Sequence, residues 1–353
     1  HPRAYAGRPC VVGVLRGAGG GRSLILNAHM DTAPFGDPSL WTRAAGEIHD
    51  GLLYGRGAWD DKAGVVQMLM IAEALRRSGV RLAGDLILKS VVEDEESGNG
   101  TLACLERGFS GDAAVVLDGT WPERYIVTHM GHVWFRIRLE GRGAPSSVAA
   151  RGLNPLLGVG PLVKAFADFA ARRNAEDGRA WGAQRDPYFV NLGRIEGGEY
   201  PGSVPRSCTI EGHYGFLPPA DPDVAREEIE RMLADLSSSP SWPLETPPKA
   251  TFYGAHTPAY AGQADSEPVR LLKEAVHRLR GRDVIESVIT GWCDLRHYES
   301  NPWFPPVPGL LYGPGGGANA HIEDEHYRLE HLVPVAQNVA SLALAWCGEG
   351  GSR

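Results

Sequence analysis

The sequence predicts an α/β protein in two parts, with a small split-βαβ domain inserted into a larger layered α/β domain. Strands and helices alternate over the first 128 residues, which is typical of a layered α/β domain. From residue 129 the elements follow the order β-α-β-β-α-β, and the α/β pattern returns after residue 257. We therefore expect residues 1–128 and 258–353 to form one domain and residues 129–257 to form the insertion.

The expected elements of the larger domain each depend on a local pattern. Residues 11–15 and 23–28 are apolar strand candidates, and the glycine-rich run between them predicts a hairpin-like turn. Residues 61–78 predict a helix, since acids stand at its start and arginines near its end. The other expected elements are strands at 85–92, 113–117, 284–290 and 309–312 and helices at 266–280 and 329–346.

A change in hydrophobic periodicity indicates where the inserted domain begins. Residues 133–141 alternate apolar and polar side chains, as a half-exposed antiparallel strand does. Two helices covering one face of the sheet complete the split-βαβ pattern. The remaining expected elements are helices at about 155–174 and 221–236 and strands at 188–196, 207–216 and 249–254.

Composition excludes several classes of protein. Of 353 residues, 43% are hydrophobic and 22% are charged, which is ordinary for a globular protein. The net charge is −8 and no basic tract is present, which argues against nucleic acid and membrane as partners. The five cysteines are scattered and form no C-x-x-C motif, so we expect reduced thiols in a cytoplasmic protein.

Residues that suit metal binding follow the predicted strands. His29 and Asp31 come directly after the predicted strand 23–28. If the strand conformation continues to them, they face the same way, because residues two apart in a strand do so. One imidazole nitrogen would bind a metal while the other donates its N–H to the carboxylate. Taken alone, the motif is more often a His–Asp pair that only stabilises the strand end.

Two acidic pairs extend the pattern. Asp60 and Asp61 precede the helix 61–78, where one carboxylate would cap the helix and leave the other for a cation. The acidic run 93–96 follows the strand 85–92 directly, at the end where α/β sheets bind ligands. Of two adjacent carboxylates there, one would bind a metal ion and the other would accept a proton from metal-bound water. A solvated acidic loop is the alternative.

Asp118 and His321 also follow predicted strands and complete the set. Two histidines and three carboxylates suit two zinc-like ions about 3.5–4 Å apart, bridged by one carboxylate and a water.

Five motifs in a fixed order carry a resemblance to a known family. They read HMDT at 29–32, GRGAWDDKAG at 55–64, DEESG at 94–98, LDGT at 117–120 and AHIEDE at 320–325. This order resembles the co-catalytic zinc amidohydrolases and peptidases, which include acetylornithine deacetylase, succinyl-diaminopimelate desuccinylase, aminoacylase and glutamate carboxypeptidase. The resemblance implies metal ligands at His29, Asp60, Glu96, Asp118 and His321, with Asp60 bridging, Asp31 orienting His29, Glu95 as general base and Asn191 contacting the substrate.

The same resemblance implies a fold and an activity. The fold is a layered α/β/α catalytic domain with a ferredoxin-like lid, through which a homodimer often forms. The activity is hydrolysis of an amide bond in a small N-acyl amino acid or peptide, by a water that two divalent ions, Zn²⁺ or Co²⁺, activate. The alternatives are a dipeptidase or carboxypeptidase, or a member that binds metal but is impaired in catalysis. A two-metal phosphoesterase is disfavoured, because no Arg or Lys phosphate clamp is placed near the ions.

Two departures from the family pattern concern the lid. Pro145 stands where relatives carry a histidine that binds the oxyanion, so His129 and His132 become the nearest candidate donors. His213 stands where relatives often have an arginine, so binding of a substrate carboxylate is expected to differ.

Overall fold

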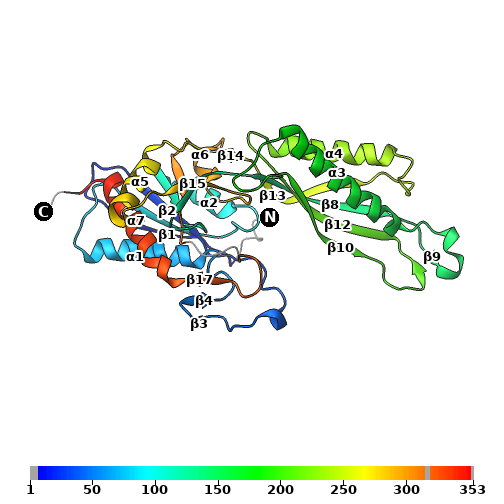
Figure 1. Cartoon of the computed structure of the whole chain (residues 1–353), viewed down its shortest axis with the longest axis horizontal. Coiled ribbons are helices and arrows are strands. Elements are labelled where there is room, and N and C mark those ends of the chain that lie inside the picture. Colours follow the sequence, from blue (N-terminus) through cyan, green and yellow to red (C-terminus); the bar gives the residue numbers. More distant parts are fainter. Residues whose placement is uncertain (1–6, 315–318, 351–353) are drawn as a thin grey trace. The chain divides into compact units, whose positions relative to one another are not determined.

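The computed structural model describes residues 7–314 and 319–350, and it divides the chain into two compact units. The first unit holds residues 1–128, 262–287 and 293–353, and the second holds 129–261 and 288–292. The second boundary therefore falls four residues later than the expected 257/258, and a short later segment joins the second unit. Figure 1 shows the labelled helices and strands of both units.

The first unit is built on a mixed sheet whose centre is parallel. Its strands lie in the order β1-β5-β2-β6-β16-β7, and β15 pairs with β7. β2 runs parallel to both β5 and β6, and β16 runs parallel to β6. The strands are β1 (Val11–Leu15), β2 (Leu24–His29), β5 (Leu86–Val91), β6 (Ala113–Val116), β7 (Arg124–His129), β15 (Ile285–Ile289) and β16 (Gly309–Leu311).

Helices cover both faces of this sheet, as the layered prediction requires (Figure 1). On one face, Leu24 and Leu26 of β2 join the main apolar core with side chains of α1, α5 and α7. On the other face, Lys89 of β5 is buried and donates to the Tyr298 hydroxyl of α6 at 3.3 Å. The helices are α1 (Lys62–Arg77), α2 (Asn99–Glu106), α5 (Glu267–Arg280), α6 (Arg296–Glu299) and α7 (Leu332–Cys347).

The predicted hairpin between residues 11–15 and 23–28 is wrong, because β5 lies between β1 and β2. β1 pairs antiparallel with β5 and not with β2. The glycine-rich segment crosses the chain before β5, and a Cβ at Gly17 would lie 2.4 Å from the Ala83 carbonyl oxygen. The glycines thus allow two backbones to cross at close approach, which places β1 at the outer edge.

The parallel strands place three segments at one edge of the sheet. β2, β5 and β6 run in the same direction, so the residues that follow them meet where the strands end. His29 is the last residue of β2, the acidic run follows β5, and Asp118 lies two residues beyond β6. The fold thereby gathers side chains that are far apart in the sequence.

The second unit has the expected split-βαβ fold. Its four strands are antiparallel in the order β10-β12-β8-β13, which is the ferredoxin-like order. Alternate residues of β8 such as Phe135 pack against the helices, and the Phe135 and Phe166 rings stack at 4.9 Å. The elements are β8 (Gly131–Glu140), α3 (Val159–Asp177), β10 (Phe189–Gly197), β12 (Ser207–Phe216), α4 (Pro222–Ser238) and β13 (Lys249–Thr257).

Several short elements complete the chain. None of the helices in the described part of the chain is long and apolar enough to span a bilayer. The sequence patterns did not predict β7 or α2, which are short and flanked by loops. The remaining strands are β3 (Ile48–His49), β4 (Leu52–Tyr54) and β17 (His326–Arg328), which pair together, β9 (Ala144–Pro145) with β11 (Ser203–Val204), and β14 (Tyr260–Ala261).

Candidate metal centre

His29 lies at the centre of the candidate site, at the end of β2. Its side chain is 3% exposed, and its Nε2 lies 2.9 Å from Oδ1 of Asp60. Its Nδ1 faces Asp31, 3.0 Å from the main-chain oxygen and 3.5 Å from the carboxylate. Asp31 also accepts a hydrogen bond from the Glu95 N–H at 3.2 Å. Asp31 therefore lies where it fixes the direction of both His29 and the acidic turn.

The two adjacent aspartates before α1 have separate roles. Asp61 is fully buried and caps the helix, accepting hydrogen bonds from the N–H groups of Gly64 and His29. Asp60 points the other way, and its Oδ2 lies 3.0 Å from Nε2 of His321. The two oxygens of Asp60 thus face two different imidazoles, as a carboxylate bridging two ions would.

The acidic run forms a tight turn that decides which carboxylates point inward. Glu93 has a positive φ of 76°, and its carbonyl accepts the N–H of Ser97 at 2.8 Å. The side chain of Glu93 forms an ion pair with Arg8. Beyond this turn Asp94 is buried, Glu95 is partly buried and Glu96 is exposed.

Glu95 is held against His321 by two contacts. Its Oε2 lies 3.1 Å from the His321 Nε2, and its Oε1 accepts the N–H of Ala33 at 2.9 Å. His321 itself has a positive φ of 65° after β16. One imidazole nitrogen therefore meets carboxylates from two different segments.

The side chains form two groups of three possible ligands. Within each group the ligand atoms all lie within 4.8 Å of one another. Nitrogen and oxygen donors of this kind suit zinc and similar divalent ions. The groups are His29 with Asp94 and Asp118, and Asp60 with Glu95 and His321.

The electrostatics of the two groups favour bound cations. Burial, together with the charge of Asp60, raises the pKa of Asp118 to about 7. Burial, with a contribution from Asp294, also raises the pKa of Asp94 well above its usual value. Hydrogen bonds to Asp60 and Glu95 raise the pKa of His321 to about 10. Carboxylates crowded in this way are stabilised by positive charge, and two divalent ions would supply it.

The acidic turn is where the two side-chain groups and the implied ligand set assign different residues. The resemblance implies Glu96 as a ligand and Glu95 as the free base, but Glu96 lies outside both groups with an exposed side chain. Glu95 lies inside the second group, and Asp94, which was not assigned a role, lies inside the first. With the turn at Glu93, Asp94 and Glu95 are the less exposed acids and Glu96 the exposed one. A run of four acids contains no pattern that fixes this register.

The lid residues singled out from the sequence lie in the second unit. Asn191 of β10 is paired with His213 of β12, and both line a cavity of about 200 Å³ with Trp134 and Tyr253. Burial lowers the pKa of His213 to about 4, so this imidazole is neutral at physiological pH.

The candidate oxyanion donors differ in their surroundings. His132 is buried, and its Nδ1 is hydrogen-bonded to Nε2 of His213. His129 is also buried, and its Nδ1 lies 2.8 Å from the Met130 carbonyl oxygen. Pro145 lies on the short strand β9 with an exposed side chain.

Two sequence relatives match almost the whole chain. The N-formyl-4-amino-5-aminomethyl-2-methylpyrimidine deformylase of Bacillus subtilis is 29% identical over 376 residues, which cover 97% of this chain and 84% of that protein. The protein of the same name from Halalkalibacterium halodurans is 27% identical over 368 residues, with the same coverage.

Solved structures of similar fold cover the chain equally well. The dipeptidase Dug1p of Saccharomyces cerevisiae superposes with a TM-score of 0.77 at 13% identity, covering 96% of this chain and 82% of that one. A dinuclear metal binding peptidase of the M20 family from Bacillus subtilis superposes with a TM-score of 0.63 at 17% identity, covering 96% of this chain and 85% of that one.

The aminopeptidase PepT of Bacillus cereus superposes with a TM-score of 0.64 at 18% identity, covering 97% of this chain and 86% of that one. At these identities the superpositions establish the fold alone.

A family model decides the assignment. The model described as Peptidase family M20/M25/M40 matches residues 25–345, which is most of the chain. The resemblance inferred from the five motifs is thereby confirmed, as is the expectation of an enzyme. The chain belongs to the M20/M25/M40 peptidase family, and it is a metallohydrolase of that family.

Proposed function

We propose that this chain is an N-deacylase that hydrolyses the amide bond of a small N-acyl substrate with two divalent ions, zinc in the first place and cobalt as a substitute. The observation that carries the proposal is the position of Asp60. Its two oxygens lie 2.9 and 3.0 Å from two imidazoles, and each imidazole also belongs to a group with further carboxylates. A bridging carboxylate between two histidine-containing groups is the arrangement that a two-metal hydrolase needs.

In this proposal each group holds one ion. His29 and Asp118 would hold the first, and Glu95 and His321 the second, with Asp60 between them. When bound, the ions would polarise the substrate carbonyl and lower the pKa of the attacking water. Asp31 keeps the imidazole of His29 in place through its contacts with Nδ1.

Asp94 is our candidate for the proton acceptor. It is the inward carboxylate next to Glu95, and it lies within 4.8 Å of the ligand atoms of His29 and Asp118. It would take a proton from the attacking water and return it to the leaving amine. The alternative, implied by the family resemblance, keeps Glu95 as base and Glu96 as ligand.

The lid cavity supports a substrate whose amine part lacks a carboxylate. His213 is neutral at physiological pH, so it offers no positive charge to a substrate anion. Arg194, which lines the same cavity, already forms ion pairs with Glu196 and Glu211. Trp134 and Tyr253 add aromatic surface suited to a planar group. The named activity of the two sequence relatives, on an N-formyl aminomethylpyrimidine, agrees with this proposal.

A substrate panel tests the proposal. The protein loaded with Zn²⁺ or Co²⁺ is assayed with N-formyl, N-acetyl and N-succinyl derivatives of amino acids and of an aminomethylpyrimidine, and with dipeptides. We expect metal-dependent release of amine, fastest from short-acyl derivatives without a carboxylate. Turnover of dipeptides alone would assign the chain to the peptidases, and no turnover of any compound would indicate a member that binds metal without catalysis.

A further inference from the structure

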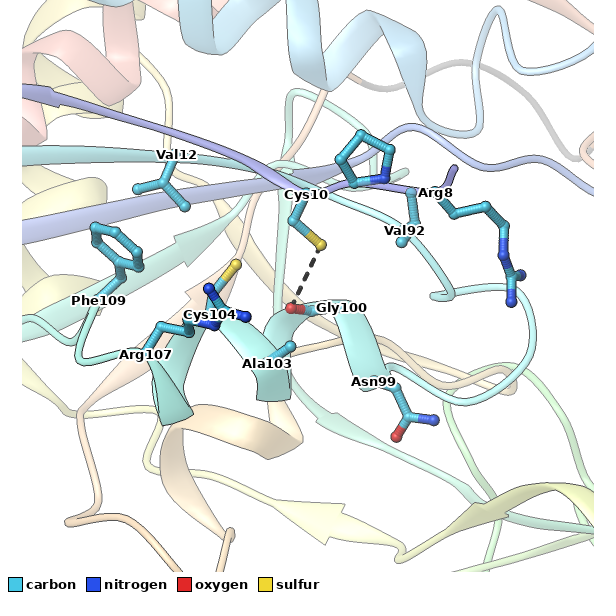
Figure 2. Close-up of a pocket in the computed structure, with 11 residues that line it drawn as sticks. Arg8, Cys10, Val12, Val92, Asn99, Gly100, Ala103, Cys104, Arg107 and Phe109 are labelled. Atoms are coloured by element: carbon cyan, nitrogen blue, oxygen red, sulfur yellow. Dashed lines mark hydrogen bonds between the residues drawn. The ribbon is translucent and has the colours of Figure 1, made fainter. Parts of the chain in front are cut away.

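A second cavity lies in the first unit, between the start of β1 and helix α2. Its volume is about 340 Å³, and two cysteines, Cys10 and Cys104, are part of its lining (Figure 2). Cys10 is partly exposed, whereas Cys104 is 4% exposed. The other lining residues are Arg8, Pro9, Val12, Val92, Asn99, Gly100, Ala103, Arg107 and Phe109.

The two thiols interact with each other and differ in acidity. A hydrogen bond with Cys104 lowers the pKa of Cys10 to about 7, against the opposing effect of burial. The same interaction, with burial, raises the pKa of Cys104 far above its usual value. The Sγ of Cys10 also lies 3.6 Å from the Gly100 carbonyl oxygen, drawn as the dashed line in Figure 2. Because Cys10 is the more exposed and the more acidic thiol of the pair, we expect it rather than the buried Cys104 to react as the nucleophile.

The cavity gives this nucleophile a place for a small partner. Val12, Val92 and Phe109 supply apolar surface in the lining. Arg107 adds a positive charge, which favours a partner that carries carboxylates, as peptide thiols do. The volume lies within the range of pockets that bind small molecules, which is about 300–1,000 Å³.

We propose that Cys10 is a site of reversible S-thiolation by a low-molecular-weight disulfide that binds in this cavity. The Cys10 thiolate attacks one sulfur of the disulfide, a new S–S bond forms, and the second thiol leaves as a thiolate that takes a proton from solvent. Cys10 is oxidised and the leaving half is reduced, so no other oxidant is needed. None of the residues proposed to hold the metal ions lines this cavity, and the proposal does not depend on the deacylase activity.

Three other cysteines serve as internal controls. Cys208, Cys293 and Cys347 are at most 1% exposed, and burial raises the pKa of each thiol. None of the three lines this cavity. The proposal therefore predicts modification at Cys10 before any of them.

The test treats the intact protein with oxidised glutathione and follows the products by mass spectrometry and peptide mapping. We expect one glutathione per chain, on Cys10, with a rate that rises through a midpoint near pH 7. Cys10→Ser should abolish this fast addition, and Cys208→Ser should leave it unchanged. Addition elsewhere first, an unchanged rate in Cys10→Ser, or an internal Cys10–Cys104 disulfide in place of the adduct would overturn the proposal.

Two substitutions of Cys104 separate its role from packing. Cys104→Ala removes the hydrogen-bond donor, so the midpoint of the rate profile should move up by about one pH unit, toward the value of an ordinary thiol. Cys104→Ser keeps a donor and should retain a midpoint near that of the unmodified chain. Equal midpoints in the original protein and Cys104→Ala would show that Cys104 does not activate Cys10.

Discussion

At the scale of single residues, the candidate site depends on which way each acid points after its strand. The sequence predicted that His29, Asp118 and His321 follow strands of one sheet, and the five-motif resemblance added Asp60, which precedes α1. The acidic run alone does not distinguish Asp94, Glu95 and Glu96, and the resemblance assigned Glu95 as base and Glu96 as ligand. Which acids point inward depends on the positive φ of Glu93 and on the turn closed by its carbonyl. Backbone geometry of this kind is not encoded in a run of similar side chains.

The neighbouring glutamates give a matched test of the metal ligands. Glu95→Gln removes a carboxylate ligand from the second group. Loss of a residue that only supports a metal ligand lowers metal affinity roughly 10–100-fold, so we expect the affinity for one of the two ions to fall by at least that much. Glu96→Gln alters an exposed side chain and should leave metal content unchanged. Metal content after dialysis is the measurement. Metal loss in Glu96→Gln with retention in Glu95→Gln would restore the roles that the resemblance implies.

Asp94→Asn tests the proton acceptor separately. The amide cannot accept the proton of water as a carboxylate does, so we expect kcat to fall by about 10²–10⁴-fold or more while both ions remain bound. Steady-state kinetics and metal content are measured on the same preparation. Full activity in this variant would exclude Asp94, and Glu95 would become the base. The fold is checked by comparing thermal unfolding with that of the unmodified protein.

At the scale of elements, the sequence predicted strands well where a long apolar run crosses the core. β2, β5 and β6 were found within one or two residues because their buried side chains leave a continuous apolar signal. Strand order was not predictable in the same way, and the expected hairpin was wrong. The pairing of β1 with β5 depends on the close crossing at Gly17 and Gly84, which is a long-range contact that no local pattern records.

The short helix α6 carries a prediction about pH. Burial raises the pKa of Glu299 to about 7, although the Gly309 N–H donates to its carboxylate. The pKa of Glu299 in the folded protein lies above the value of about 4.5 for the unfolded chain, so folding favours the protonated carboxyl. The protein is therefore most stable with respect to this group below pH 4.5, and this stability is lost as the pH rises through 7. Glu299→Gln keeps an acceptor without a charge. We expect the free energy of unfolding of this variant to exceed that of the unmodified protein by about 1–2 kcal/mol at pH 8, with little difference at pH 4.5.

Thermal or denaturant unfolding of both proteins at the two pH values measures this difference. Glu330→Gln is the matched control. The Glu330 side chain is 73% exposed, so the change in free energy of unfolding that this substitution causes should be the same at both pH values. A difference between Glu299→Gln and the original that is the same at pH 4.5 and pH 8 would show that Glu299 does not titrate across this range.

At the scale of the whole molecule, the inserted domain was predictable because its periodicity differs from that of the flanking chain. β8 alternates apolar and polar residues, whereas the central strands of the first unit are buried throughout. The exact boundary was less predictable. The second unit extends to residue 261 and also takes in residues 288–292, which are separated from it in sequence. Contacts between distant segments decide such boundaries.

The edge strand β10 of the second unit offers a test of the homodimer that the family resemblance implies. β10 lies at one edge of its four-stranded sheet, and an edge strand leaves backbone donors and acceptors that a second copy of the strand can pair with. Ile195 on this strand is 50% exposed, which adds apolar surface at the same edge. We therefore expect the protein to sediment as a dimer at micromolar concentration.

Substitution of Ile195 by arginine tests where that dimer forms. A charge at this position should be buried without a partner on association, so we expect Ile195→Arg to raise the dissociation constant by at least tenfold, which is about 1.4 kcal/mol. Val224→Arg is the matched control, because Val224 is equally exposed at 50% but lies on α4 rather than on the edge strand. Sedimentation equilibrium measures both variants and the original. A monomeric original would exclude the homodimer, and dissociation of Val224→Arg but not Ile195→Arg would move the interface from β10 to the helical face.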